Sequence, residues 1–226
     1  MKALLLTLSL AVASVTAQAQ VAPSASEAAA YTGLHAAAHK GDVASIGQLS
    51  ASGAALNATD GNGRTPLHVA AFARQREAVK ALAKAGADLN KLDNDRYDAV
   101  TITSVADDEA TLRVLLQLGA SAKQVTSRYE GTALIAAAHL GHDGVVRQLI
   151  AAGAPLDHVN NLHWTAVIES IVLGDGGPRH QATLKALLDA GSSVQLTNRA
   201  GNTPLALANA RGYSEMVVIL EKFKAR

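Results

Sequence analysis

Histidine is the residue of this sequence most suited to metal binding, and two pairs of histidines have helical spacing. His35 and His39 are four residues apart, which places both imidazoles on one face of a helix, as in two-histidine metal sites. His139 and His142 are three residues apart and form a weaker pair. Structural zinc sites need four ligands and catalytic ones three. The sequence has no cysteine, and neither pair has an acidic residue at a supporting spacing, so we predict no metal site and no cofactor.

The segment 174–180, GDGGPRH, is rich in glycine like a phosphate-binding loop. It lacks the Gly-Lys-Ser/Thr ending that places a lysine and a hydroxyl on the phosphate and its metal. Neither the Gly-x-Ser-x-Gly nor the His-Glu-x-x-His signature occurs, and no carboxylates cluster around a candidate base. We predict no catalytic residues and no enzymatic activity. An enzyme would require the histidine pairs to be true metal ligands.

His68 follows Thr65 by three residues in the stretch TPLHVAAF, and this stretch is one of several copies. Similar heads are TGLHAAAHKGD at 32, TPLHVAAFARQ at 65, DAVTITSVADD at 98, TALIAAAHLGH at 132, TAVIESIVLGD at 165 and TPLALANARGY at 203. A second motif recurs with glycines at positions 53, 86, 119, 153 and 191, which are 33, 33, 34 and 38 residues apart. The chain is therefore an array of repeats.

Each repeat has the signals of two helices and a hairpin. The head threonine caps a short helix by accepting from a backbone N–H two or three residues on, and proline suits the first helical position. Alanines allow close approach of neighbouring helices, a glycine turn leads into a second helix, and a further glycine ends that helix. One unit of about 33 residues cannot offset its loss of conformational entropy, so the units must stack in a row.

This pattern resembles that of ankyrin repeat proteins, in particular Thr65-Pro66-Leu67-His68 with the tail 86–90, GADLN. The resemblance implies an all-α solenoid of about six helix-turn-helix/β-hairpin units. The third unit departs from the pattern at its head and carries Thr103 and Ser104 where small apolar residues are usual, the fifth has about five extra residues, and the last is shortened. The expected domain has repeats at 31–63, 64–96, 97–130, 131–163, 164–201 and 202–226.

The resemblance also assigns His68 a structural role. The equivalent position holds His35 in the first unit, but Thr101, Ile135, Ile168 and Ala206 in the others. In ankyrin repeat proteins the head histidine bonds with the head threonine and the neighbouring backbone. We expect the same of His68.

Residues 1–19 have the three parts of an export signal. Lys2 supplies the positive start, an apolar run extends from Ala3 to Val15, and Ala17-Gln18-Ala19 provides the small residues that a signal peptidase requires. A buried N-terminal helix is the alternative. We expect a mature chain from Gln20, with a flexible leader at 20–30, located in the periplasm of a Gram-negative bacterium. Secretion beyond the cell is the alternative location.

Composition argues against two classes of partner. The chain has 20 basic and 19 acidic residues, and it shows no run of lysine or arginine. It therefore lacks the one-sided positive field on which nucleic acid binding depends. Nor does it have a basic cluster that would hold it on an anionic membrane. We predict no nucleic acid partner and no membrane insertion after signal removal.

The aromatic residues point to a protein partner. Aromatics make up 3% of the chain, yet most of them lie in hairpins or at the ends of first helices. In the ankyrin fold these positions line a concave surface, and arginines accompany them, as in protein-interface hot spots. The alternative is that these aromatics simply stack on their neighbours. The predicted partner-binding residues are Arg64, Phe72, Tyr97, Arg128, Tyr129, Trp164 and Arg199.

Together these features predict a non-enzymatic module of an exported bacterial type that binds another exported protein. Its expected role is that of inhibitor, protector or scaffold. The alternative is a secreted effector that binds a host protein. We interpret segment 174–180 as an enlarged turn between helices, with a partner-contacting loop as the alternative.

Overall fold

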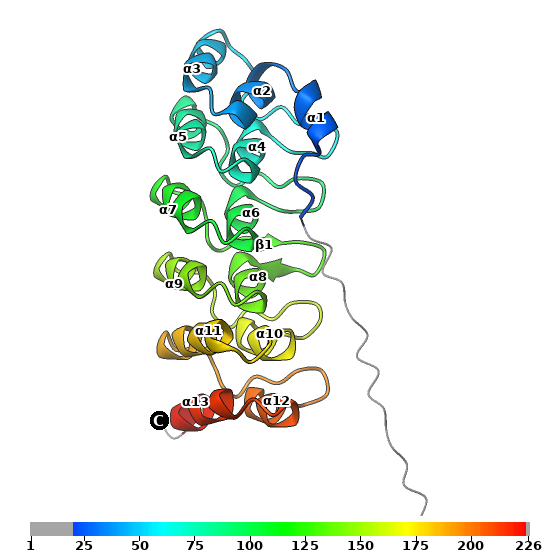
Figure 1. The fold of residues 1–226 in the computed structure, drawn as a ribbon, viewed down its shortest axis with the longest axis vertical. Coiled ribbons are helices and arrows are strands. Elements are labelled where there is room, and N and C mark those ends of the chain that lie inside the picture. Colours follow the sequence, from blue (N-terminus) through cyan, green and yellow to red (C-terminus); the bar gives the residue numbers. More distant parts are fainter. Residues whose placement is uncertain (1–19, 225–226) are drawn as a thin grey trace, which may run out of the picture.

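The computed structural model describes residues 20–224. Within this range, pairs of antiparallel helices stack in a row, with the first helices in one column, the second helices in another and the hairpins projecting beyond the first column (Figure 1). Each first helix of the four inner repeats packs between the first helices of its neighbours, as α4 does between α2 and α6. The predicted solenoid is confirmed.

The helices and strands have the following bounds. The first helices are α2 (Gly33–Lys40), α4 (Pro66–Phe72), α6 (Ala99–Val105), α8 (Ala133–His139), α10 (Ala166–Val172) and α12 (Pro204–Arg211). The second helices are α3 (Val43–Ala51), α5 (Arg76–Ala85), α7 (Glu109–Gln117), α9 (Asp143–Ala151), α11 (Pro178–Asp189) and α13 (Ser214–Lys224). A short helix, α1 (Ala25–Ala30), precedes them. Strands β1 (Val125–Thr126) and β2 (Gly131–Thr132) pair antiparallel, with Val125 opposite Thr132.

The core is a continuous layer between the two columns of helices. First helices contribute small residues such as Ala70, Ala71 and Ala138, which are fully buried and let neighbouring repeats approach closely. Second helices contribute branched side chains such as Leu82 and Leu149, also fully buried. Because every repeat shares its apolar faces with its neighbours, no repeat has a core of its own.

Threonine capping of the first helices follows the prediction in four repeats. The hydroxyls of Thr65, Thr132, Thr165 and Thr203 accept a hydrogen bond from the backbone N–H three residues on. Thr32 makes no such bond, so the prediction is wrong for the first repeat. Asp98 replaces the threonine in α6, and its carboxylate accepts from the N–H of Thr101 at 2.7 Å.

The hairpins, which we call fingers, join one another through their backbones. The N–H of Asn94 donates to the carbonyl of Asn62 at 3.1 Å, and that of Asn161 donates to the carbonyl of Tyr129 at 3.0 Å. The fingers of the second to sixth repeats turn at a residue with left-handed backbone three positions before the first residue of the helix that follows. Glycine occupies this position at Gly63 (φ 76°) and Gly201 (φ 77°).

These two glycines differ in what surrounds them, which yields a matched stability test. A Cβ on Gly63 would lie 2.7 Å from the backbone nitrogen of Asn94, whereas a Cβ on Gly201 would meet nothing within 4 Å. An alanine at either position pays about 1 kcal/mol for its left-handed backbone. Gly63→Ala adds to this a steric clash with the next finger. We expect urea unfolding to show a larger loss for Gly63→Ala than for Gly201→Ala. Equal losses would contradict the interlocking of fingers.

The segment expected to be a flexible leader contains an ordered helix. Ser24 and Glu27 form a reciprocal capping box at the start of α1. The carboxylate of Glu27 also contacts Arg64 of the next finger at 2.6 Å, and Arg64 donates to the carbonyl of Val21 at 3.2 Å. These contacts hold residues 20–30 against the first two repeats. The predicted export signal, residues 1–19, lies outside the described residues.

The extra residues of the fifth repeat form an enlarged turn before α11. His180 bridges this turn to the fourth repeat, with its Nδ1 2.8 Å from Asp175 and its Nε2 2.9 Å from the carbonyl oxygen of His139. The hydroxyl of Tyr213 donates to the carbonyl of Gly174 at 2.8 Å and ties the turn to the last repeat. Segment 174–180 therefore makes hydrogen bonds with both the fourth and the last repeat.

Candidate binding surface

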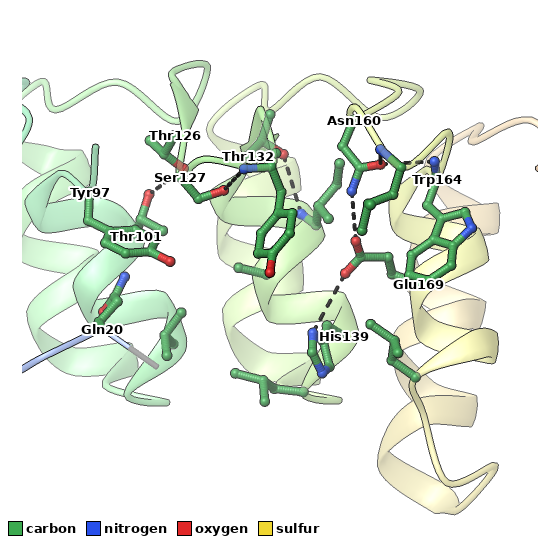
Figure 2. A pocket seen from close by; sticks show the side chains of 18 residues that line it. Gln20, Tyr97, Thr101, Thr126, Ser127, Thr132, His139, Asn160, Trp164 and Glu169 are labelled. Atoms are coloured by element: carbon green, nitrogen blue, oxygen red, sulfur yellow. Dashed lines mark hydrogen bonds and ion pairs between the residues drawn. The ribbon is translucent and has the colours of Figure 1, made fainter. Parts of the chain in front are cut away.

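A cavity of about 250 Å³ opens between the fingers and the first helices of the third, fourth and fifth repeats. We call it the finger pocket. Tyr97, Tyr129 and Trp164 are among its lining residues, and α6, α8 and α10 form its helical side. Tyr97 and Trp164 are labelled in Figure 2. The structure thus brings three predicted binding residues together around one hollow.

Small side chains at two repeat positions help to open the pocket. Thr101 of α6 stands where the second repeat has His68, and it is too short to reach the next finger's backbone as His68 does. Its hydroxyl instead bonds with that of Thr126 at 3.2 Å. Ala136 of α8 faces the pocket at the position where α6 has Ile102.

Gln20 lines the pocket beside α6, and its side-chain nitrogen is buried without a hydrogen-bond partner in the described part of the chain.

Glu169 of α10 places a carboxyl group on the wall of this pocket. The residue is 6% exposed, and its Oε1 accepts a hydrogen bond from Asn160 at 2.8 Å. Its Oε2 lies 3.7 Å from Nδ1 of His139 (Figure 2). Burial raises the pKa of Glu169 to about 7, against a smaller lowering effect of the Asn160 hydrogen bond. The carboxylate form is therefore held in an environment that disfavours it.

Among the residues that the structure describes, the neighbours of Glu169 are held in place and supply no full positive charge at neutral pH. Asn160 accepts from the backbone N–H groups of Leu162 and Trp164 at 3.0 Å each, so its amide nitrogen must face Glu169. Burial lowers the pKa of His139, and the nearby His180 lowers it further. At neutral pH, His139 is consequently an uncharged neighbour of the carboxyl group.

The other predicted binding residues lie outside the pocket lining. Phe72, at the end of α4, is half-buried and packs against the core. The guanidinium of Arg128 lies over the ring of Tyr129, 5.4 Å from its centroid, and so extends the aromatic surface at the fourth finger. Arg199 is exposed on the last finger and donates to the carbonyl of Asn161 at 3.0 Å.

Arg64 requires a correction, because its side chain is inaccessible to a partner. It is 1% exposed and forms ion pairs with Asp60 at 2.7 Å and with Glu27 at 2.6 Å. Tyr31 donates its hydroxyl to the same Asp60 oxygen at 2.7 Å. The position before a head residue carries an aromatic in other repeats, which suggested a surface role, but the α1 segment covers it here. Arg64 is a structural residue.

Glu169 was missed by the sequence analysis, although the repeat alignment contains its signal. The equivalent positions in the other repeats are Ala36, Val69, Ile102, Ala136 and Leu207, all apolar. A single acid in a column of apolar residues conflicts with core packing. Functional or strained sites are where such conflicts are expected. His139 and Asn160 could only be found after Glu169, because their roles depend on its position.

The histidines of the predicted pairs mostly bond to neighbouring repeats. Nε2 of His35 lies 2.9 Å from the carbonyl oxygen of Arg64, and Nδ1 of His142 lies 2.9 Å from that of Ser104. His68 accepts from the N–H of Thr65 through Nδ1 and donates through Nε2 to Tyr97, which confirms its structural role. Over residues 20–224, no group of three or more His, Asp or Glu side chains is placed to hold a metal ion.

In the described part of the chain, the helices are too short or too polar to cross a bilayer.

Comparisons with known proteins extend these observations. A family model described as ankyrin repeats (three copies) matches residues 8–93 and 99–198. An ankyrin repeat domain from Acinetobacter baumannii is 40% identical, with a TM-score of 0.80 over 84% of this chain and 97% of that domain. One chain of a complex between a predatory endopeptidase and an immunity protein from Bdellovibrio bacteriovorus is 24% identical, with a TM-score of 0.70 over 85% of this chain and 98% of that one. At that identity the likeness shows the fold alone.

The ankyrin repeat protein YahD of Escherichia coli is 39% identical over 95 residues, which are 42% of this chain and 47% of YahD. The present chain therefore spans less than half of that relative.

Proposed function

The chain belongs to the ankyrin repeat family, and we propose that it binds another exported protein through the finger pocket and the fingers around it. Ankyrin repeats are protein–protein interaction modules, and the family is generally non-enzymatic. The observation that carries the proposal is the gathering of Tyr97, Tyr129 and Trp164 around one pocket in a chain with so few aromatics. Aromatic side chains that line a partly desolvated hollow are typical anchors of protein interfaces.

The proposed location is the periplasm, and the proposed role is that of a non-catalytic inhibitor, protector or scaffold of the partner. Support for export comes from the sequence of residues 1–19, with its positive start, apolar run and small residues before Gln20. Neither pair of histidines offers the three ligands that a catalytic zinc needs, which supports a role without catalysis.

The proposed function is tested by affinity capture. Residues 20–226 serve as bait for the periplasmic extract of the source bacterium, beside the double variant Tyr97→Ala/Trp164→Ala. We expect the wild type to retain a defined partner and the double variant to lose it, because two aromatic anchors each contribute about 2 kcal/mol or more. Circular dichroism must show the same helical signal for both proteins.

The matched control removes two exposed apolar side chains from the opposite face. Leu118 follows α7 and is 40% exposed, and Val218 of α13 is 64% exposed. Leu118→Ala/Val218→Ala should retain the partner as the wild type does. Loss of the partner in this control, with retention in the double aromatic variant, would move the interface to the second helices.

A further inference from the structure

The finger pocket holds a buried carboxyl group that has no charged partner in the described residues facing it. Glu169 is 6% exposed, and among the described residues the one basic side chain within ion-pair distance is His139, at 3.7 Å. The low pKa of His139 keeps that imidazole neutral near pH 7. A buried carboxylate without a cation is costly unless a ligand supplies the charge.

The walls around this acid suit the alkyl part of a cationic side chain. Tyr97, Tyr129 and Trp164 contribute aromatic surface, which attracts cations as well as methylene groups. Ile135 of α8 and Leu173, which directly follows α10, add aliphatic surface. The volume of about 250 Å³ is below the range of roughly 300–1,000 Å³ typical of drug-sized ligands. The pocket is therefore sized for one side chain.

The hydrogen bonds of Glu169 discriminate between cations. Oε1 already accepts a hydrogen bond from Asn160, whereas Oε2 accepts none from the described residues. Arginine binds carboxylates best through two parallel hydrogen bonds, one to each oxygen, and here the Asn160 amide already takes one of the accepting sites of Oε1. A quaternary ammonium has no N–H to donate. A primary ammonium donates one hydrogen bond to one oxygen and meets the requirement.

We propose that the finger pocket binds a lysine side chain of the partner protein, with its ammonium on Oε2 of Glu169 and its stem against Tyr97, Tyr129 and Trp164. The inference rests on the proposed function and names the partner's anchoring residue. It explains why this one repeat carries an acid where the other five carry apolar residues. The buried acid is complementary to a cation that the side chains of the described residues do not supply.

Trp164 provides the readout, because it is the single tryptophan of the chain and lies in the pocket wall. The probe is Nα-acetyl-lysine methylamide, titrated into residues 20–226 at pH 8 while Trp164 fluorescence is recorded. A ligand of this size should bind with a dissociation constant on the order of 1 mM. The Nε-acetylated form of the probe has the same stem without the charge. We expect it to bind at least about tenfold more weakly.

Variants assign the binding to Glu169. Glu169→Gln keeps an acceptor for Asn160 but removes the charge, so lysine affinity should fall at least about tenfold. The control Glu221→Gln changes an exposed acid on α13 and should bind the probe like the wild type. Equal binding of charged and acetylated probes, equal binding by Glu169→Gln, or no saturable response would overturn the proposal.

Acidification provides an independent readout. The titratable groups that line the pocket are Glu169, His139, Tyr97 and Tyr129, and His142 and His180 act on His139. With a pKa of about 7, Glu169 is mostly ionised at pH 8 and mostly protonated at pH 6. Lysine binding should therefore weaken by about tenfold over this interval, and a pH-independent affinity would contradict the proposal.

The outcomes separate this inference from the proposed function. If partner capture depends on Tyr97 and Trp164 but the lysine probe fails, the pocket takes another group and the proposed function stands. If the probe binds as expected and no partner depends on the aromatics, the lysine site stands without the proposed interface.

Discussion

Arg64→Ala should lower the free energy of unfolding by about 3 kcal/mol, because it leaves the carboxylate of Asp60 without its ion-pair partner in a mostly buried position. The side chain of Asp60 is 11% exposed, and that of Arg64 is 1% exposed. The pKa of Asp60 is lowered to about 2, since hydrogen bonds from Tyr31 and Arg64 outweigh the opposing effect of burial. In the folded protein Asp60 is therefore ionised. In the Arg64→Ala variant no guanidinium is present to balance that negative charge.

Urea unfolding followed by circular dichroism measures this effect, with Arg199→Ala as control. Arg199 is exposed and donates a hydrogen bond to the backbone carbonyl of Asn161, so its loss should cost less than about 1 kcal/mol. In a stack of repeats the damage should concentrate at the N-terminal end, because each repeat contacts only its neighbours. Equal, small losses in both variants would show that Arg64 is dispensable and that our correction of its role is wrong.

Glu169→Gln should act in the opposite direction and raise the free energy of unfolding by about 2–3 kcal/mol at pH 8. Glu169 has a pKa of about 7 in the folded protein, against an ordinary value of 4.5. Folding therefore favours its protonated form. The stability associated with this proton is fully present below about pH 4.5 and is lost as the pH rises through 7. Glutamine resembles the protonated acid at every pH.

Thermal unfolding at pH 5 and pH 8 checks the prediction. The variant should gain several degrees over the wild type at pH 8 and much less at pH 5, where folded Glu169 is already protonated. Glu221→Gln, on the exposed face of α13, should change the midpoint little at either pH. A Glu169→Gln variant that is less stable than the wild type at pH 8 would mean that the carboxylate is well compensated in the pocket.

A stabilising substitution that also abolishes lysine binding would identify Glu169 as a residue kept for function at the expense of stability. That combination distinguishes a binding acid from a structural one. Arg64 shows the contrasting case, since its charges are paired within the chain and its removal should only destabilise.

The repeated heads and tails predicted the solenoid because a period of about 33 residues directly reflects the stacking unit. Tyr97 and Trp164 could be placed on one surface for the same reason, since they occupy equivalent positions and such positions align in a stack. Tyr129 could be placed beside them because it lies in the hairpin between them. Arg64 could not be interpreted correctly, because α1 comes from a segment outside the repeat pattern and covers it. Its contact with Glu27 depends on how that segment folds back.

Glu169 illustrates a different limit. Its departure from an apolar column is visible in the sequence, but its environment depends on Asn160 from a finger and His139 from the preceding repeat. The cavity also requires the small side chain of Ala136 opposite it. A repeat pattern predicts where each position lies, whereas the depth of a pocket depends on the sizes of side chains from several repeats.

Site-directed photo-crosslinking tests most directly whether the partner protein binds at the finger pocket. A photoreactive phenylalanine analogue at position 129 lies in the pocket wall, and the same analogue at position 118 lies on the column of second helices. Each protein is incubated with the captured partner and irradiated. We expect the analogue at position 129 to form a covalent adduct with the partner and the analogue at position 118 to form none. An adduct from position 118 alone would contradict it.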